Sequence, residues 1–188
     1  MPLAVRPLIF LMKHHGCGCG GSSVEGYFSR FLCDEEHLIL EFGVAEGRTL
    51  RNLASWFCKK RVFGFDSFQG IPEKWLEHDQ GTFRVEGPLP DVAPNAQLVV
   101  GWFNESLPQW KVDHNQKIAL LHIDCDLFSS TAFVLEHLTD MLTVGTIIVF
   151  DELFIIDSYW NESLDVLGGE LGALYRWSHA HPEFEWRW

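Results

Sequence analysis

Short apolar runs alternate with segments of helical periodicity along most of the chain. Runs of about four to eight residues are typical of buried strands, whereas apolar residues three and four positions apart are typical of helices. The expected strands are residues 38–42, 61–65, 96–100, 117–123, 146–150 and 184–188. The expected helices are residues 24–33, 48–59, a short one near 73–78, 129–142 with its N-cap among Ser129, Ser130 and Thr131, and 169–180. This alternation predicts a doubly wound α/β sheet.

The beginning of the chain has a different character. Residues 1–23 end in a stretch rich in glycine and serine, so we expect a flexible leader and order from about Val24 onward. The leader holds two histidines and two cysteines, but glycines separate the cysteines and no second ligand pair follows, which disfavours a metal site there. The remaining residues, 24–188, have the length of one domain with a single core.

The charge and the cysteine content restrict the classes of partner molecule and the cellular compartment that we expect. The chain has 26 acidic residues against 14 Lys and Arg, so a nucleic-acid backbone is disfavoured and a small molecule or a cation is expected. Five irregularly spaced cysteines do not form a disulfide framework, which favours a reducing compartment, the cytoplasm. No apolar run is long enough for a membrane span, so no membrane partner is expected.

Acidic residues follow two of the expected strands at the point where each strand ends. Asp124 and Asp126 come after residues 117–123, and Asp151 and Glu152 come after residues 146–150. Carboxyl ends of parallel strands meet at one edge of a sheet, so these four carboxylates are expected to converge there. A single acid at such a position is often only a solvent-facing cap, whereas the group indicates a site. His122 lies inside the expected strand, and we expect it to be a satisfied core histidine rather than a base.

The turn after the first of these strands is a second candidate site. Gly43 and Gly47 stand between a strand and a helix, where glycine lets a ligand approach the backbone and the helix N–H groups face it. Ala45 breaks the register of a dinucleotide fingerprint. Asp66, at the end of the next strand, is placed to take both hydroxyls of a ribose. The pattern predicts a nucleoside cofactor without a pyrophosphate.

Four motifs occur in an order and spacing that resemble a known family. They are LEFGV at 40–44, GFDSFQGIP at 64–72, LHIDCDLFSST at 121–131 and GTIIVFDE at 145–152. The chain resembles the class I S-adenosylmethionine-dependent methyltransferases, and specifically the macrocin O-methyltransferase family. The resemblance implies a Rossmann-like, mostly parallel sheet of order 3-2-1-4-5 plus an edge strand, with helices on both faces.

The resemblance also implies roles for individual residues. Around S-adenosyl-L-methionine it places Glu41, Gly43 and Gly47 at the amino-acid end, Asp66 and Ser67 at the ribose, and Trp102 beside the adenine. It assigns the metal, usually Mg²⁺, to Asp126, Asp151 and Glu152, and makes Asp124 the candidate general base. Oxygen ligands suit Mg²⁺, and a bound cation makes the acceptor hydroxyl easier to deprotonate.

The implied function is Mg²⁺-assisted O-methylation of a small-molecule hydroxyl, of sugar or natural-product type. One alternative is a catalytically silent nucleoside- or metal-binding module of the same fold, and another is a nicotinamide-dependent oxidoreductase. Two departures from the family stand out. Glu152 occupies a position where many relatives have aspartate, and the chain stops at Trp188 where the family usually adds an antiparallel hairpin, so a truncated sheet is one reading of this end. Oligomeric state, including a homo-oligomer, stays open.

Overall fold

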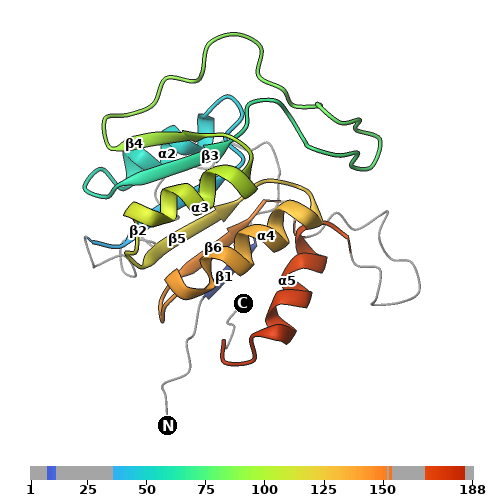
Figure 1. The fold of residues 1–188 in the computed structure, drawn as a ribbon. Helices are drawn as coiled ribbons and strands as arrows, with labels where there is room; N and C mark the ends of the chain where they lie inside the picture. The colour runs from blue at the N-terminus through green and yellow to red at the C-terminus, as the bar shows by residue number, and fades with distance from the viewer. Residues whose placement is uncertain (1–7, 12–35, 152, 154–167, 185–188) are drawn as a thin grey trace.

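The protein is seen here as a computed structural model, which describes residues 8–11, 36–151, 153 and 168–184. Its centre is a six-stranded sheet whose strands are paired in parallel, with the strand order β1-β6-β5-β2-β3-β4 (Figure 1). The strands are β1 Leu8–Leu11, β2 Leu38–Phe42, β3 Val62–Asp66, β4 Ala96–Val100, β5 Ile118–Ile123 and β6 Ile147–Phe150. Without β1 this is the predicted order 3-2-1-4-5, which is confirmed.

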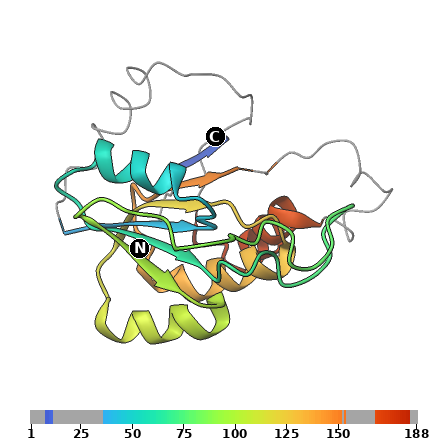
Figure 2. The same cartoon turned by 90° about the horizontal axis from the view of Figure 1, so that it is seen from above.

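Helices cover both faces of the sheet. They are α2 Arg48–Trp56, α3 Phe103–Asp113, α4 Phe128–Leu138, the 3₁₀ turn η1 Thr139–Met141 and α5 Gly169–Ala180. Figure 2 shows α2 on one face and α3, α4 and α5 on the other. Side chains of β2, β3 and β5 accordingly divide between two apolar clusters, one packed on Leu50 and Leu53 of α2 and the other on Leu107, Val134 and Trp177. Burial on both faces explains why these strands are nearly continuous apolar runs.

The strand beside β6 is one that the sequence did not predict. The edge is formed by β1, which pairs with β6 from Leu8 opposite Ile147 to Leu11 opposite Phe150. The described part of the expected leader is therefore a strand. The predicted strand at 184–188 lies outside the described residues except for Phe184, and the predicted helix at 24–33 lies outside them entirely.

Two local predictions were wrong, and one helix was missed. Residues 73–78 form no helix; instead Trp75 and His78 make an antiparallel bridge inside the long connection between β3 and β4. Helix α3 was not predicted, because Pro108 interrupts its pattern. Helix α4 begins at Phe128, and Leu127 occupies its N-cap without a side-chain hydrogen bond, so the serine and threonine residues lie inside the helix.

None of the helices within the described ranges combines the length and the apolar character that crossing a bilayer would require.

Candidate functional site

A cavity of about 900 Å³ lies at the carboxyl edge of the sheet. The turn after β2, the loop after β3, the start of α3, the connection from β5 to α4 and the end of β6 all contribute to its wall. The wall has two parts of different composition. The turn side consists of Gly43, Asp66, Ser67 and Trp102, and the acidic side consists of Asp124, Asp126 and Asp151.

The turn after β2 passes very close to the end of β5. Gly43 has a φ of +94°, and a Cβ atom built on it would stand 1.7 Å from the carbonyl oxygen of Asp124. The backbone N–H of Asp124 donates to the carbonyl oxygen of Phe42 at 2.8 Å, and the N–H of Gly43 donates to that of Phe65 at 3.0 Å. Only glycine fits this crossing, for both conformation and space.

Asp66 holds the same turn in place from the neighbouring strand. Its Oδ2 accepts hydrogen bonds from the backbone N–H groups of Val44 and Ala45, both at 2.8 Å, and its Oδ1 accepts one from Phe68 at 2.7 Å. Ala45 has a φ of +46°, so the carboxylate stabilises a turn conformation that is otherwise disfavoured. Asp66 therefore shapes the turn side of the cavity in addition to lining it.

The structure places the predicted cofactor residues in two groups. Gly43, Asp66, Ser67 and Trp102 line the cavity, and Trp102 is the N-cap residue of α3. Glu41 and Gly47 do not line it. Gly47 is the N-cap of α2, where a Cβ atom would lie 2.9 Å from the Cβ of Pro90, and Glu41 is buried inside the sheet.

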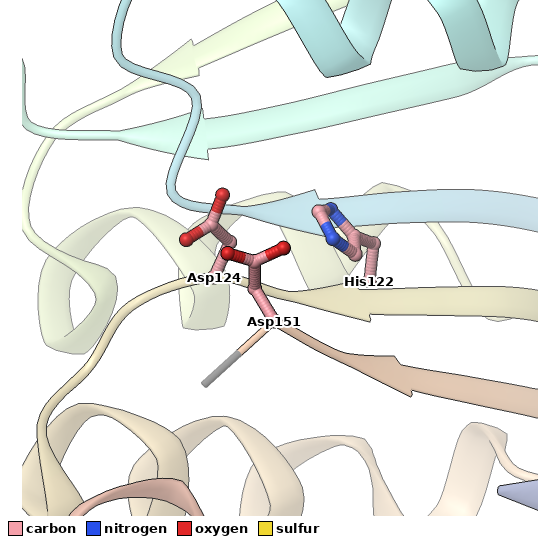
Figure 3. Close-up of side chains that lie close together, drawn as sticks. All are labelled: His122, Asp124 and Asp151. Atoms are coloured by element: carbon pink, nitrogen blue, oxygen red, sulfur yellow. The ribbon is translucent and has the colours of Figure 1, made fainter. Parts of the chain in front are cut away.

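The acidic side forms where β5 and β6 end. One ligand atom from each of His122, Asp124 and Asp151 lies within 4.8 Å of the others (Figure 3). Asp126 lines the cavity with a φ of +61° but stands outside this group, and Glu152 lies outside the described residues. The predicted base, Asp124, thus lies in the group of potential ligands, and His122 joins it from within the strand.

Crowding and burial change the protonation of this group. Burial raises the pKa of Asp124 to about 7, and the nearby Asp151 carboxylate adds to the increase. Burial disfavours the ionised form because the charge loses hydration, and a second charge of the same sign close by disfavours it through repulsion. Asp124 is therefore mostly protonated below about pH 7 unless a positive charge is bound nearby.

Glu41 and His122 form a buried pair behind the acidic side. The two residues stand opposite each other in the pairing of β2 with β5, and Nδ1 of His122 lies 3.1 Å from Oε1 of Glu41. Burial raises the pKa of Glu41, while hydrogen bonding to Glu41 raises the pKa of His122 against the effect of its own burial. The prediction of a satisfied core histidine is thereby confirmed. Glu41 Oε2 has no hydrogen-bond partner among the described residues.

The residues of the acidic side fit a divalent cation. Carboxylate oxygens and an imidazole nitrogen are the donors that such ions take in proteins. The hydrogen bond to Glu41 engages Nδ1 of His122 and leaves Nε2 as the remaining ring nitrogen, an arrangement common behind metal-ligating histidines. A positive charge there would relieve the mutual repulsion of Asp124 and Asp151.

Several aromatic residues of the wall were not singled out from the sequence as site residues. Trp75, His78 and Phe83 line the cavity from the long β3–β4 connection, and Phe133 lines it from α4. The sequence does contain a signal for these residues, because large aromatic side chains are unusual in a loop rich in glycine and proline. Their common direction depends on the fold of the loop, which the sequence pattern does not reveal.

Comparison with known proteins gives the class. A family model described as a methyltransferase domain matches residues 40–153, from β2 to just beyond β6, and the chain belongs to this family. The oxidoreductase alternative is therefore set aside as the class of this domain.

Individual proteins similar to the chain are also named as methyltransferases. The chain is 28% identical over 117 residues to the 8-demethyl-8-(2,3-dimethoxy-alpha-L-rhamnosyl)-tetracenomycin-C 4'-O-methyltransferase of Streptomyces olivaceus, covering 51% of this chain and 43% of that one. The crystal structure of CalS11, a calicheamicin methyltransferase, superposes with a TM-score of 0.61 at 30% identity, covering 69% of this chain and 63% of that chain. An apo structure of CalS11, titled a TDP-rhamnose 3'-O-methyltransferase, shares the fold with a TM-score of 0.56 at 24% identity, covering 81% and 67%. The chain thus spans less than half of the curated relative's length.

Proposed function

We propose that this protein transfers a methyl group from S-adenosyl-L-methionine to a hydroxyl of a small sugar-bearing molecule, with the help of a divalent cation, Mg²⁺ in the first instance. One observation carries the proposal. In a chain of the methyltransferase-domain family, a single cavity joins the glycine turn and Asp66 on one side to the paired acids at the ends of β5 and β6 on the other.

On the turn side, the protein would bind the methyl donor. The turn at Gly43 lets a ligand lie against the backbone, and Ser67 and Trp102 offer a hydroxyl and an indole ring to the nucleoside. S-adenosyl-L-methionine supplies a methyl group on a positively charged sulfur. The acidic lining of the cavity favours such a cationic donor over its neutral product.

On the acidic side, the protein would orient and deprotonate the acceptor. Asp124 is the candidate base, because its carboxyl group lines the same cavity at the end of β5, and a cation bound beside it would keep it ionised and able to accept a proton. Asp126 and Asp151 would fix the hydroxyl in line with the methyl group, and such orientation lowers the barrier to the transfer. A divalent cation held by this side would make the hydroxyl more acidic.

The names of the relatives support a sugar hydroxyl as the acceptor. The tetracenomycin enzyme is named for methylation of a rhamnosyl compound, and CalS11 is titled a TDP-rhamnose 3'-O-methyltransferase, an enzyme in calicheamicin biosynthesis. The cavity lined by the glycine turn and by the acids at the ends of β5 and β6 supports such a reaction. The catalytically silent module, the remaining alternative, has the same fold but no turnover.

Calorimetric titration with S-adenosyl-L-methionine and with NADH, each with and without Mg²⁺, tests the donor. We expect saturable binding of the sulfonium donor only. Formation of S-adenosylhomocysteine with 4-nitrophenyl α-L-rhamnopyranoside then tests turnover, and Asp124→Asn should abolish it while keeping donor binding. The exposed Asp113→Asn serves as the matched control. Donor binding without product across a panel of glycosides would select the silent module, and binding of NADH alone would refute the proposal.

A further inference from the structure

We propose that Glu170, in the first turn of α5, is a positioning residue for the acidic side of the cavity. Its carboxylate accepts a hydrogen bond from the backbone N–H of Cys125, and this contact holds the connection that carries Asp124 and Asp126. The inference rests on the proposed function and adds to it a residue that lies beyond the stretch 40–153 matched by the family model.

The connection from β5 to α4 has a strained backbone. The N–H of Leu127 donates to the carbonyl oxygen of Cys125, only two residues earlier, at 2.6 Å, and Asp126 between them has a φ of +61°. A hydrogen bond of this span around a positive φ makes a γ-turn of the rare and strained form. Such a conformation persists only where the surrounding structure fixes it. The position of the Asp126 carboxylate therefore depends on contacts that other elements supply.

Three elements hold the two residues that precede this turn. The N–H of Asp124 donates to the carbonyl oxygen of Phe42 in β2 at 2.8 Å. The Sγ atom of Cys125 lies 3.4 Å from the hydroxyl oxygen of Thr131 in α4, and the N–H of Cys125 donates to Oε1 of Glu170 in α5 at 3.2 Å. Of these contacts, the one from α5 is made by a carboxylate, which is a stronger acceptor than a neutral oxygen.

Helix α5 begins directly against the same turn. A Cβ atom built on Gly169 would stand 3.3 Å from the carbonyl oxygen of Asp126. Further along, α5 packs beside α4, as Figure 1 shows. The Glu170 side chain therefore reaches the N–H of Cys125 from a helix whose own position is fixed by packing.

The burial of Glu170 is not explained by helix packing. Its side chain is 0% exposed, although acidic side chains are almost never fully buried unless they have a partner. An acid in a first turn also stabilises the helix dipole, but an exposed one does so without losing its hydration. The buried residues that follow along α5, Ala173, Leu174 and Trp177, are apolar. The hydrogen bond to the turn accounts for an acid at this position.

Displacement of the Cys125 peptide would move two carboxylates at once. Asp124 directly precedes Cys125 and Asp126 directly follows it, and both line the cavity. Residues that orient the ligands of a metal ion typically change its affinity by 10- to 100-fold when they are replaced. Loss of the Glu170 contact should therefore weaken cation binding and spare the turn side.

Calorimetric titration with Mn²⁺ tests the proposal on two variants of Glu170. Glu170→Asp keeps the charge but withdraws the carboxylate by one methylene, and Glu170→Gln keeps the reach and an acceptor oxygen but removes the charge. We expect Mn²⁺ affinity to fall about tenfold in Glu170→Asp and to stay within about twofold of wild type in Glu170→Gln. Binding of S-adenosyl-L-methionine should stay unchanged in both.

Thr146→Ala is the matched control for a general loss of stability. The buried hydroxyl of Thr146 accepts a hydrogen bond from the backbone N–H of Thr143 at 2.9 Å, before the start of β6 and away from the acidic side. This variant also removes a buried side-chain acceptor from a backbone N–H. It should lower the urea midpoint without weakening Mn²⁺ binding.

Amide hydrogen exchange of Cys125, followed by NMR in the ligand-free protein, tests the contact without cation or donor. We expect exchange about tenfold faster in Glu170→Asp and unchanged in Glu170→Gln and Thr146→Ala. The proposal is overturned if Glu170→Asp keeps wild-type Mn²⁺ affinity, if Glu170→Gln binds Mn²⁺ as weakly as Glu170→Asp, or if Thr146→Ala weakens binding equally. A wild-type protein that binds neither Mn²⁺ nor the donor refutes the proposed function, and the exchange rates still decide whether Glu170 holds the turn.

Discussion

At the end of β3, the carboxylate of Asp66 accepts three backbone hydrogen bonds, whereas at the ends of β5 and β6 the carboxylates of Asp124 and Asp151 face one another and His122. On the turn side of the cavity, the Asp66 carboxylate thus has its hydrogen-bond donors within the protein itself. The acidic side is assembled from groups that repel each other. The comparison teaches that equally acidic strand ends differ in their surroundings: one carboxylate fixes the shape of the turn, whereas the other two crowd each other in an arrangement that a positive charge would relieve.

The largest expected effect comes from breaking the contact between the two sides. Gly43→Ala would place a methyl group against the Asp124 carbonyl and impose a disfavoured φ, so we expect a loss of more than about 4 kcal/mol in the free energy of unfolding. Urea denaturation measures it. Gly87→Ala shares a positive φ of +106° with nothing within 4 Å and should cost only about 1 kcal/mol. Equal losses in the two variants would mean that the close approach is unimportant.

Neutralising the acidic side should stabilise the metal-free protein at alkaline pH. The pKa of Asp124 is about 7 in the folded protein, against about 3.9 for an unperturbed aspartate. Between these values the folded state keeps a proton that the unfolded state has lost, so stability falls as pH rises from about 4 to 7. Asp124→Asn does not titrate, and we expect it to be about 2 to 4 kcal/mol more stable than wild type at pH 8 with EDTA present.

Urea unfolding at pH 5 and pH 8 measures this difference, with Asp113→Asn as the exposed control. The wild-type protein should lose stability between the two pH values by more than Asp124→Asn does. An Asp124→Asn variant that is less stable than wild type at pH 8 would show that the carboxylate is held by favourable contacts instead.

Neutralising the turn side should have the opposite sign. Asp66→Asn weakens three hydrogen bonds to a charged acceptor, so we expect a loss of about 2 to 3 kcal/mol at pH 8, together with weaker binding of S-adenosyl-L-methionine. Thermal or urea unfolding and calorimetry measure the two effects. Asp91→Asn, which is exposed, should change neither. If Asp66→Asn and Asp124→Asn shift stability in the same direction, the contrast between the two sides does not hold.

Much of the fold followed from the sequence because its strands are buried on both faces. The bounds of β2, β4 and α5 agree with the expected ones, since continuous apolar runs and helical spacing mark them directly. The strand β1 was missed because a four-residue edge strand is defined by its pairing with β6 rather than by its own pattern. Helix α3 was missed because Pro108 and a weak apolar stripe hide its periodicity.

The sequence predicts the parts of the candidate site that depend on the order of the strands. It does not predict those that depend on which residues of neighbouring strands stand opposite each other. Parallel strands bring Asp66, Asp124 and Asp151 to one edge, as expected. The pairing of Glu41 with His122 follows from the alignment of β2 with β5, and it leaves Glu41 buried behind the acidic side and outside the cavity lining, while its predicted role at the cofactor stays a prediction. The hydrogen bonds of Asp66 arise from the three-dimensional path of the turn, which no spacing rule contains.

Calorimetric titration of the protein with Mn²⁺ and Mg²⁺, before any methyl donor is added, tests the central contrast most directly. We predict one ion per chain, with binding lost in Asp151→Asn and kept in Asp66→Asn, and a stabilisation of about 1 to 3 kcal/mol at saturating ion. The same samples titrated with S-adenosyl-L-methionine should show the reverse sensitivity, weakened by Asp66→Asn. Ion binding that Asp151→Asn leaves intact, or that both variants lose equally, would contradict the account.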